Sequence, residues 1–401
     1  MKKNIENNKP SFILLIILLG FPQLHEAMIS PSIQNIADRF MIHIDQAQLV
    51  LSLYFTAFAI GVLFWGYFSD IKGRRTAMIS GFITYISGTL IALFAPSFNI
   101  FMIGRFIGAF GLATGSVTTQ TILREAFSQD VRNKLFSQVS IALAFVPGIG
   151  PTLGGALVDN GGVRLLLICL VIASFCIVAV TYYRLPETQV KTDSTKVNFL
   201  DVAKRMLCSK TVWIYGFFIA AYNAIMSIYY MEIPLLFTHH FQMSLAKIGS
   251  FGISLAIATI IGALCTQQLL KKHDPRSIIM IGNIIVLCGA IFMASTSVLV
   301  TNEAIKPFLY ILGMFIVRFG TAVSLSNAIS LSLNGFEDVY GTAGSLLSLG
   351  YYLGISGLMQ IMSLVRTDSL LMMPLYFVIL AIIMIGLTYL VMDKSNKITK
   401  K

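Results

Sequence analysis

Charge is the property that this sequence has least of. Only 12% of its 401 residues are Asp, Glu, Lys or Arg, whereas a soluble domain carries about 25%. Hydrophobic residues make up 56% of the chain, and the mean hydropathy is +0.80. A chain of this length otherwise suggests two or three soluble domains, but so few charges exclude a protein that is surrounded by water on all sides.

Cysteine is also sparse and unpatterned. The five cysteines are odd in number and scattered, and no CxxC spacing joins any two of them, so we expect neither a disulfide framework nor a thiolate metal site. HExxH, GxSxG and the Walker lysine loop are absent too. We therefore expect no enzyme, no ATP-driven pump made by this chain alone, and no metal or cofactor.

Apolar runs of about 20 residues, the length that crosses a bilayer as an α-helix, fill most of the chain. We predict an all-α integral membrane protein with twelve transmembrane helices. The first six lie at about residues 12–31, 46–69, 77–95, 98–123, 135–158 and 164–184, and the second six at about 211–233, 247–270, 276–298, 306–333, 342–365 and 369–392. The N-terminal run resembles a signal peptide, but no A-x-A cleavage site follows it, so we expect it to remain as the first helix.

One long polar stretch divides the chain. We predict a six-helix bundle at residues 1–190, a cytoplasmic linker at 191–210 and a second six-helix bundle at 211–401. A short internal echo supports two related halves, because IGRFIGAFGLATGSV around Arg105 resembles IVRFGTAVSLSNAIS around Arg318. Paired halves with a substrate site between them, near the middle of the membrane, are the architecture of many transporters.

The formal net charge of +11 alone suggests a nucleic-acid partner, but the positions of the basic residues make one unnecessary. With the N-terminus inside, 22 of the 29 Lys and Arg residues fall in inner segments. The others are Arg39, Arg164, Lys247, Lys306 and Arg366 in outer loops, and Arg105 and Arg318 within apolar runs. The positive-inside rule therefore predicts a multi-pass protein of the cell (inner) membrane, with both termini in the cytoplasm and an even number of helices.

A tight turn between the second and third helices, GYFSDIKGRR at residues 66–75, combines one carboxylate with three cations. Gly73 allows the sharp reversal. We expect Asp70 to bond nearby backbone N–H groups, or the N-terminus of a helix in the other half at Gly341 and Thr342, and so to hold the cytoplasmic side shut. A basic loop that only sets topology is the alternative. This candidate gate consists of Gly66, Asp70, Gly73, Arg74 and Arg75.

Helix-breaking residues crowd the fifth helix, in the run AFVPGIGPTLGG. Prolines remove backbone hydrogen bonds, and glycines allow helices to approach closely. The run predicts a bent, tightly packed helix about which two bundles rock, although close packing alone explains it equally well. The residues concerned are Pro147, Gly150, Pro151, Gly154 and Gly155.

Three segments of the sequence, two of them described above, resemble motifs of the major facilitator superfamily. GYFSDIKGRR resembles its signature loop, roughly G-x-L-x-D-R-x-G-R-R, although Phe68 stands where Leu is usual and Ile71 where Arg is usual. AFVPGIGPTLGG is similar to the antiporter motif of drug exporters, and LPET at 185–188 resembles the Bcr/CflA drug-resistance branch. The resemblance implies the fold of that superfamily and proton-driven export in preference to uptake.

Two charged residues lie within apolar runs of the first half. Arg105 is in the fourth helix, where a charge costs about 3 kcal/mol and needs a partner, and Glu26 lies at a comparable depth in the first helix. Burial favours a neutral carboxyl and a nearby arginine favours the charged form, so we predict that Glu26 binds and releases the coupling proton beside Arg105. A structural Glu–Arg pair is the alternative. For His25, a side chain that tunes Glu26 is one interpretation, and we favour the other, that it simply faces polar neighbours.

The seventh helix carries aromatic and Met side chains along one side, a lining that suits diverse apolar ligands. Arg318 occupies the repeat position of Arg105, and Glu232 is a candidate partner for it. For each of the other residues, ordinary helix packing is the alternative. The predicted substrate cavity contains Tyr222, Asn223, Met226, Tyr230, Arg318 and Asn327.

Together these features predict a secondary transporter that exports small, amphipathic compounds by alternating access in exchange for protons, as in multidrug efflux and antibiotic resistance. Its partners are then protons, a small-molecule substrate and the lipid bilayer, and a monomer is sufficient. Export of one metabolite, such as a siderophore, an amino acid or a sugar, is the runner-up, because cavity residues spread over many helices do not specify the substrate.

Overall fold

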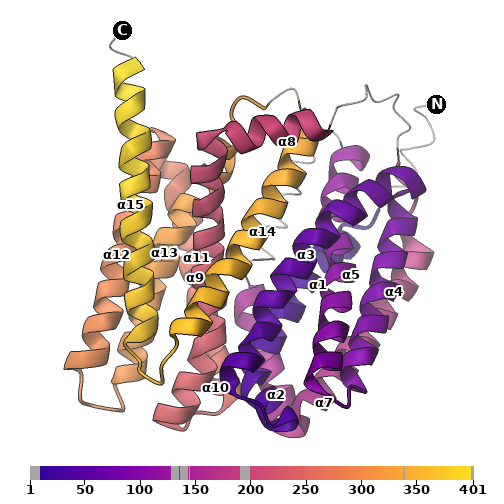
Figure 1. The fold of residues 1–401 in the computed structure, drawn as a ribbon, viewed down its shortest axis with the longest axis horizontal. Helices are drawn as coiled ribbons and strands as arrows, with labels where there is room; N and C mark the ends of the chain where they lie inside the picture. Colours follow the sequence, from indigo (N-terminus) through magenta and orange to yellow (C-terminus); the bar gives the residue numbers. More distant parts are fainter. Residues whose placement is uncertain are drawn as a thin grey trace.

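The computed structural model describes residues 10–127, 135, 143, 145–189, 199–336 and 339–398. Every regular element in these ranges is a helix, and the long helices run side by side across the molecule (Figure 1). Eleven spans in this part of the chain are long and apolar enough to cross a membrane. The all-helical membrane fold predicted from the sequence is confirmed.

In the first half, one continuous span contains α1 (Phe12–Ile29), the short 3-10 helix η2 (Ser30–Ser32) and α2 (Ile33–Phe40). Pro31, inside η2, has no backbone N–H for a regular α-helical bond, so the chain tightens there. The span ends where Met41 adopts a left-handed conformation. The remaining helices of this half are α3 (Ile44–Lys72), α4 (Arg74–Leu93), α5 (Phe98–Ala126) and α7 (Val146–Arg184).

Helix α7 contains two helical segments joined at a sharp kink. Gly161 and Gly162 have non-helical backbone angles there, and the φ of 65° at Gly162 is a conformation that favours glycine. The kink separates the predicted fifth and sixth helices, so the eleven candidate spans account for all twelve predicted crossings. Residues 136–142 and 144 of the predicted fifth helix lie outside the described part of the chain.

The second half opens with the short helix α8 (Phe199–Cys208), which lies across one end of the bundle (Figure 1). Ser209 then caps the next helix by accepting a bond from the amide of Val212. The following helices are α9 (Lys210–Phe241), α10 (Leu245–Ser250), α11 (Gly252–Leu269), α12 (Pro275–Leu299), α13 (Lys306–Ser332), α14 (Tyr340–Val365) and α15 (Met372–Ile398).

The helices form two groups. Helices α1, α3, α4, α5 and α7 pack on one another, and so do α9, α11, α12, α13, α14 and α15. The groups meet where α3 packs on α14 and where α7 packs on α10 and α11. Residues 190–198 of the predicted linker lie outside the described residues, and the domain boundaries stay a prediction.

Glycines bring the third and fourth helices of each half into backbone contact. A Cβ atom at Gly104 would lie 2.6 Å from backbone atoms of Gly88 and Ala92, and one at Gly320 would lie 2.7 Å from the carbonyl oxygen of Gly282. Such spacing admits only glycine. Each of these four helices carries two such glycines, two helical turns apart. They are Gly81 and Gly88 in α4, Gly104 and Gly111 in α5, Gly282 and Gly289 in α12, and Gly313 and Gly320 in α13. This common pattern is consistent with an internal repeat.

The two ends of the molecule differ in charge. Helix α1 begins and α15 ends at the same end as α8, while α2 and α10 lie at the opposite end (Figure 1). We call the first the basic end and the second the distal end. The basic residues at the basic end whose side chains the structure describes are Lys72, Arg74, Arg75, Arg184, Lys204, Arg205, Lys210, Lys271, Lys272 and Arg276.

Candidate functional site

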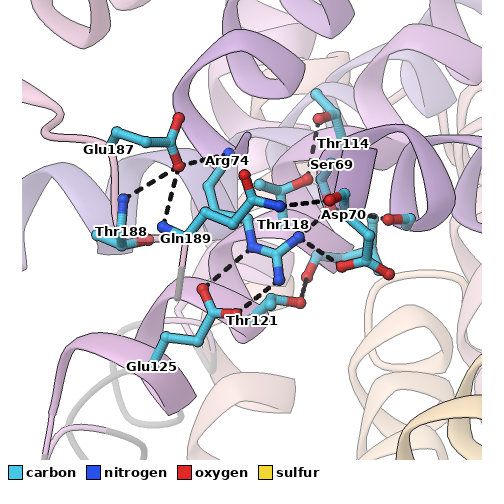
Figure 2. Close-up of polar contacts among 12 residues, drawn as sticks. Ser69, Asp70, Arg74, Thr114, Thr118, Thr121, Glu125, Glu187, Thr188 and Gln189 are labelled. Atoms are coloured by element: carbon cyan, nitrogen blue, oxygen red, sulfur yellow. Dashed lines mark hydrogen bonds and ion pairs between the residues drawn. The ribbon is translucent and has the colours of Figure 1, made fainter. Parts of the chain in front are cut away.

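At the basic end, Arg74 holds together the turn between α3 and α4. Its Nη1 lies 2.5 Å from Asp70 Oδ1 and 3.1 Å from Ser69 Oγ. Its Nε and Nη2 donate to both carboxylate oxygens of Glu125 on α5, at 3.0 and 2.6 Å. A two-point contact of this kind is the strong form of an arginine–carboxylate pair. Figure 2 shows the Arg74 guanidinium between these two carboxylates.

Glu187 caps the N-terminus of α4 (Figure 2). One of its carboxylate oxygens accepts from the amide of Arg74 at 2.8 Å, and the other accepts from the amide of Arg75 at 3.2 Å. A carboxylate in this position satisfies two free N–H groups and opposes the positive end of the helix dipole. Gly73, with φ of 94°, leaves room for it, because a Cβ atom there would collide with the Glu187 carboxylate.

The signature loop and the LPET segment therefore form one structure. Gln189 Nε2 donates to the backbone oxygen of Asp70, and the Arg75 guanidinium lies 5.1 Å from the ring centre of Tyr182. Both segments are recognisable in the sequence, but their contact is not, because more than 100 residues separate Glu187 from the helix that it caps. The available signals were a glutamate just after the sixth predicted helix and the absence of a capping side chain before the third.

Among the described contacts, Asp70 is bonded within its own half. Its carboxylate is 67% exposed and bonds Arg74, one helical turn along the chain in the same half. The bond to the helix N-terminus at Gly341 and Thr342 stays a prediction, because the contacts of Gly341 lie outside the described part of the structure. Gly66, the first residue of the loop, packs near Val117 of α5.

Glu26, on α1, faces the second half near the middle of the bundle. Ser227 Oγ of α9 donates to its Oε1 at 3.3 Å. Ser30, one turn further along the chain, donates to the backbone oxygen of Tyr230 on the same helix. Glu26 itself is half-buried. The carboxyl predicted to carry a proton thus lies at the boundary between the two groups of helices.

Arg105, on α5, is paired with His25 instead of Glu26. Its Nη1 lies 2.8 Å from His25 Nε2, and both side chains are buried, at 4% and 0% exposed. A guanidinium only donates hydrogen bonds, so His25 accepts as a neutral imidazole and carries its proton on Nδ1. The prediction that His25 only faces polar neighbours was incomplete, since it is the direct partner of the buried arginine.

Aromatic rings surround this pair. Tyr54 lies 5.8 Å and Tyr85 lies 5.1 Å from the His25 ring, measured between ring centres, and the Tyr54 hydroxyl donates to the backbone oxygen of Pro22. Neighbouring residues of α1 therefore face different ways: His25 points into the first half, and Glu26 points toward the second.

The antiporter segment of α7 packs against both halves at once. Gly150 lies against Ala27 and Gly154 against the backbone of Met28, both on α1. A Cβ atom at Gly155 would lie 2.7 Å from the backbone of Leu245, at the start of α10. The predicted bent and closely packed helix therefore lies at the boundary between the halves. Pro151 faces Gly249 of α10, whereas the side chain of Pro147 lies outside the described residues.

Two residues of the predicted substrate cavity form hydrogen bonds within the second half. The Tyr222 hydroxyl donates to Asn283 Oδ1 of α12 at 2.6 Å, and Asn283 in turn donates to Thr388 of α15. Asn327 is 3% exposed and donates to the carbonyl of Val323, on its own helix. These contacts place both side chains within the helix packing of that half in this conformation.

Of the other predicted cavity residues, Tyr230 meets the first half, where its backbone oxygen accepts from Ser30. Asn223 is half-buried and donates to the carbonyl of Ile219, while Met226 and Tyr230 are each 8% exposed. Arg318 donates from Nε to Thr259 Oγ1 of α11 at 2.8 Å. The suggested pairing of Arg318 with Glu232 is wrong, because Glu232 is bonded to other groups at the distal end.

A polar cluster at the distal end was missed by sequence analysis. Glu232, 1% exposed, accepts from Gln48 Nε2 of α3 at 2.7 Å and from Arg366 Nε, just after α14, at 3.3 Å. Arg366 also reaches Asp45 and Asp368, each at 3.3 Å. The available signal was Glu232 itself, an acidic residue within an apolar run of the seventh helix, as Glu26 is in the first.

Comparisons with known proteins bear on the fold and the family. A transporter of Rickettsia felis, named "Uncharacterized transporter", is 27% identical over 90% of this chain and 91% of its own. A chloramphenicol resistance protein of Pseudomonas aeruginosa is 26% identical, over 87% of this chain and 83% of its own. The crystal structure of a D-xylose-proton symporter superposes with a TM-score of 0.72 at 15% identity, covering 93% of this chain and 96% of the other, and so shares its fold.

The family model described as the Major Facilitator Superfamily matches residues 15–359. This match covers most of the chain, including the signature loop, the antiporter segment and both halves of the interface. The chain is therefore a member of the Major Facilitator Superfamily, a multi-pass membrane protein that acts as a secondary transporter and not as an enzyme.

Proposed function

We propose that this transporter exports small, amphipathic compounds from the cell in exchange for protons, as a member of the Bcr/CflA branch of drug:proton antiporters. The observation that carries the proposal is the position of Glu26, a half-buried carboxyl that bonds Ser227 across the interface of the two halves. A carboxyl in that position gains or loses its partner when the halves move. Proton binding and the conformational change are thereby linked.

Two further features support export over uptake. The glycine-rich segment of α7 contacts α1 on one side and α10 on the other, so it lies where the two halves must move against each other. A relative that covers most of the chain is named a chloramphenicol resistance protein. We propose by the positive-inside rule that the basic end faces the cytoplasm and the distal end faces outward.

The transport cycle would use the charges in sequence. With the distal end open, Glu26 would take a proton from outside, where the proton concentration is higher. With the basic end open, it would release that proton, and the substrate would bind among the interface side chains. Arg105, held by neutral His25, places a fixed positive charge near Glu26 and favours the release. Protons and substrate then occupy the interface alternately.

Aromatic side chains at the interface fit an amphipathic substrate. Tyr352 of α14 lies 4.9 Å from the ring of Phe58 and 6.3 Å from that of Phe55, both on α3. Such contacts bind flat apolar groups with little need for specific hydrogen bonds. We propose that the substrate site lies between α3, α9 and α14, with Met226, Asn223, Tyr230 and Arg318 near it. Tyr222 and Asn327 would join it only if the second half repacks.

The test is efflux of a fluorescent amphipathic dye from proteoliposomes. In the native protein an imposed proton gradient should drive the dye out, and a proton ionophore should stop it. Glu26→Gln removes the titrating proton but keeps the size and the acceptor oxygen for Ser227, so gradient-driven efflux should fall about tenfold or more. Glu303→Gln, at an exposed distal-end glutamate, is the matched control and should leave efflux unchanged. Undiminished proton-driven efflux by Glu26→Gln would reject the proposal.

A further inference from the structure

The cluster around Glu232 joins the two halves of the transporter at the distal end. Gln48 and Asp45 belong to α3 in the first half, and Glu232 and Arg366 belong to the second. Arg366 donates to a carboxylate of each half, Asp45 Oδ1 and Glu232 Oε2, both at 3.3 Å. We propose that these four residues are a distal lock, and that Glu232 is a second proton-binding site, whose protonation from the distal side opens it.

Charge and exposure point to a proton as the ligand. One guanidinium serves three carboxylates, Asp45, Glu232 and Asp368, so the fully ionised cluster has an excess of negative charge. Two of these are open to water, at 58% and 79% exposed, whereas the Glu232 side chain is 1% exposed. The Arg366 side chain, at 9%, lies between them. The exposure of the side chains thus decreases from Asp45 and Asp368 at the surface to the single buried carboxyl of Glu232. A proton would reach that carboxyl from the distal side.

Gln48 fits both protonation states of Glu232. Its Nε2 donates to the ionised carboxylate at 2.7 Å, while its own Oε1 is buried and has no donor among the described residues. A protonated carboxyl has an O–H to donate, and an amide that turns over offers its oxygen to accept that bond. The unused oxygen beside Glu232 therefore supplies a partner for the proton when it arrives.

Protonation would weaken the lock at its centre. Of the two bonds that the cluster makes between the halves, the one from Gln48 changes from a charge-assisted bond to a weaker neutral one, and Arg366 loses the buried carboxylate that holds it beside Asp45. Nearby bonds between the halves contain no titrating group: Ser363 Oγ donates to the Asp45 backbone oxygen, and Ser30 donates to the Tyr230 backbone oxygen. Glu232 is thus the buried carboxyl on which both bonds of the cluster between the halves depend, directly through Gln48 and indirectly through Arg366.

Several other ionisable groups lie near the cluster. His240 Nε2 lies 2.7 Å from the backbone oxygen of Asp368, and the buried Tyr229 hydroxyl has no partner among the described residues. Tyr310 of α13 donates to the backbone oxygen of Leu370. Arg39 of α2 donates to the backbone oxygens of Leu93 and Ala95, and Asp38 accepts from Gln34. Lys247 of α10, Lys210 at the start of α9 and the basic residues of α8 lie on exposed surface or at the opposite end. Unlike these groups, Glu232 bonds Gln48 of the other half directly, so the response of the distal end to pH should follow Glu232 and not His240.

The experiment measures the opening of the distal end directly. Spin labels are attached to cysteines introduced at Met41 and Leu299, exposed distal positions in opposite halves, after the five native cysteines are replaced. Distances are recorded in nanodiscs by double electron–electron resonance, at about pH 8 and about pH 5. The native sequence should give mainly the short distance at high pH, and a longer distance should grow as the pH falls.

Glu232→Gln removes the charge and keeps the shape, so the longer distance should be present at high pH and should not respond to pH. Arg366→Gln removes the cation that favours the ionised form of Glu232, so the distal end should open at higher pH. This second variant keeps the proposal testable if Glu232→Gln folds poorly. Asp368→Asn alters an exposed partner of the same arginine and should behave as the native protein does. A Glu232→Gln distal end that stays closed at high pH, or that retains the native pH response, overturns the proposal.

The distal lock rests on the proposed proton-driven transport, but the two proposals can fail independently. Glu26→Gln should keep the opening of the distal end by protons while losing proton-driven efflux. If efflux proves independent of protons but the distal end still follows Glu232, the lock stands and the exchange mechanism does not. If efflux follows Glu26 and the distal end ignores Glu232, the reverse holds.

Discussion

Arg105 is a buried cation whose stability depends on one neutral side chain. Its Nη1 bonds His25 Nε2, while its Nε and Nη2 have no partner among the described residues. His25→Leu removes the acceptor and leaves an uncompensated charge, a change that costs about 3–5 kcal/mol in buried pairs. We expect a lower melting temperature in detergent, measured by thermal-shift fluorescence, together with weaker dye efflux.

His273→Leu is the control for this substitution, because that histidine is exposed at the basic end and should leave the melting temperature nearly unchanged. If His25→Leu were as stable as the native protein, Arg105 would have to be satisfied by groups other than His25. The histidine would then not be the side chain that stabilises the buried charge.

The sequence located charged residues in membrane helices but not their partners. Glu26 and Arg105 were found because charges in apolar runs are rare and functional. Glu26 and Arg105 lie at a similar depth in the membrane, which suggested a direct pair. Adjacent residues on a helix point about 100° apart, however, so His25 and not Glu26 reaches the arginine. Glu232 and Arg366 are 134 residues apart, and no periodic pattern connects them.

At the scale of the helix, the antiporter segment depends on the absence of side chains. A Cβ atom at Gly154 would collide with the backbone of Met28 on α1. Gly154→Ala should therefore push α7 from α1, lower the melting temperature and reduce dye efflux several-fold, although alanine is the better helix former. Gly386→Ala in α15, where a Cβ meets open space, should be neutral or slightly stabilising. Equal behaviour of the two variants would show that α7 tolerates separation from α1.

Long helices were predictable, and short ones were not. Apolar length determines a membrane span, so most predicted helices overlap the observed ones closely. The seventh was too short in the prediction: α9 continues to Phe241, past Pro234, because the helix tolerates a proline within the bundle. The short helices α2 and α8 were not predicted, since each is amphipathic and carries no membrane-length signal, and α10 was merged with α11 in the predicted span 247–270.

At the scale of the whole molecule, the two halves are joined from the distal end to the middle. Arg366 and Ser363 meet Asp45 at the distal end. Closer to the middle, Ser356 Oγ lies 2.7 Å from Thr56 Oγ1 and donates to the backbone oxygen of Ser52. These bonds hold α3 against α14, so opening the distal end requires them to break together. Hydrophobic patterns predict two bundles, but the tilt at which they meet depends on these side-chain contacts.

The most direct test of proton exchange is to drive the reaction backwards. Proteoliposomes loaded with the dye, with no pH difference at the start and a pH-sensitive fluorophore inside, report any proton movement that the outward dye gradient causes. Exchange predicts that protons enter as the dye leaves, so the interior becomes acidic, and that Glu26→Gln abolishes the acidification. An interior that stays at constant pH while the native protein transports dye, or that becomes alkaline, would contradict proton-coupled export.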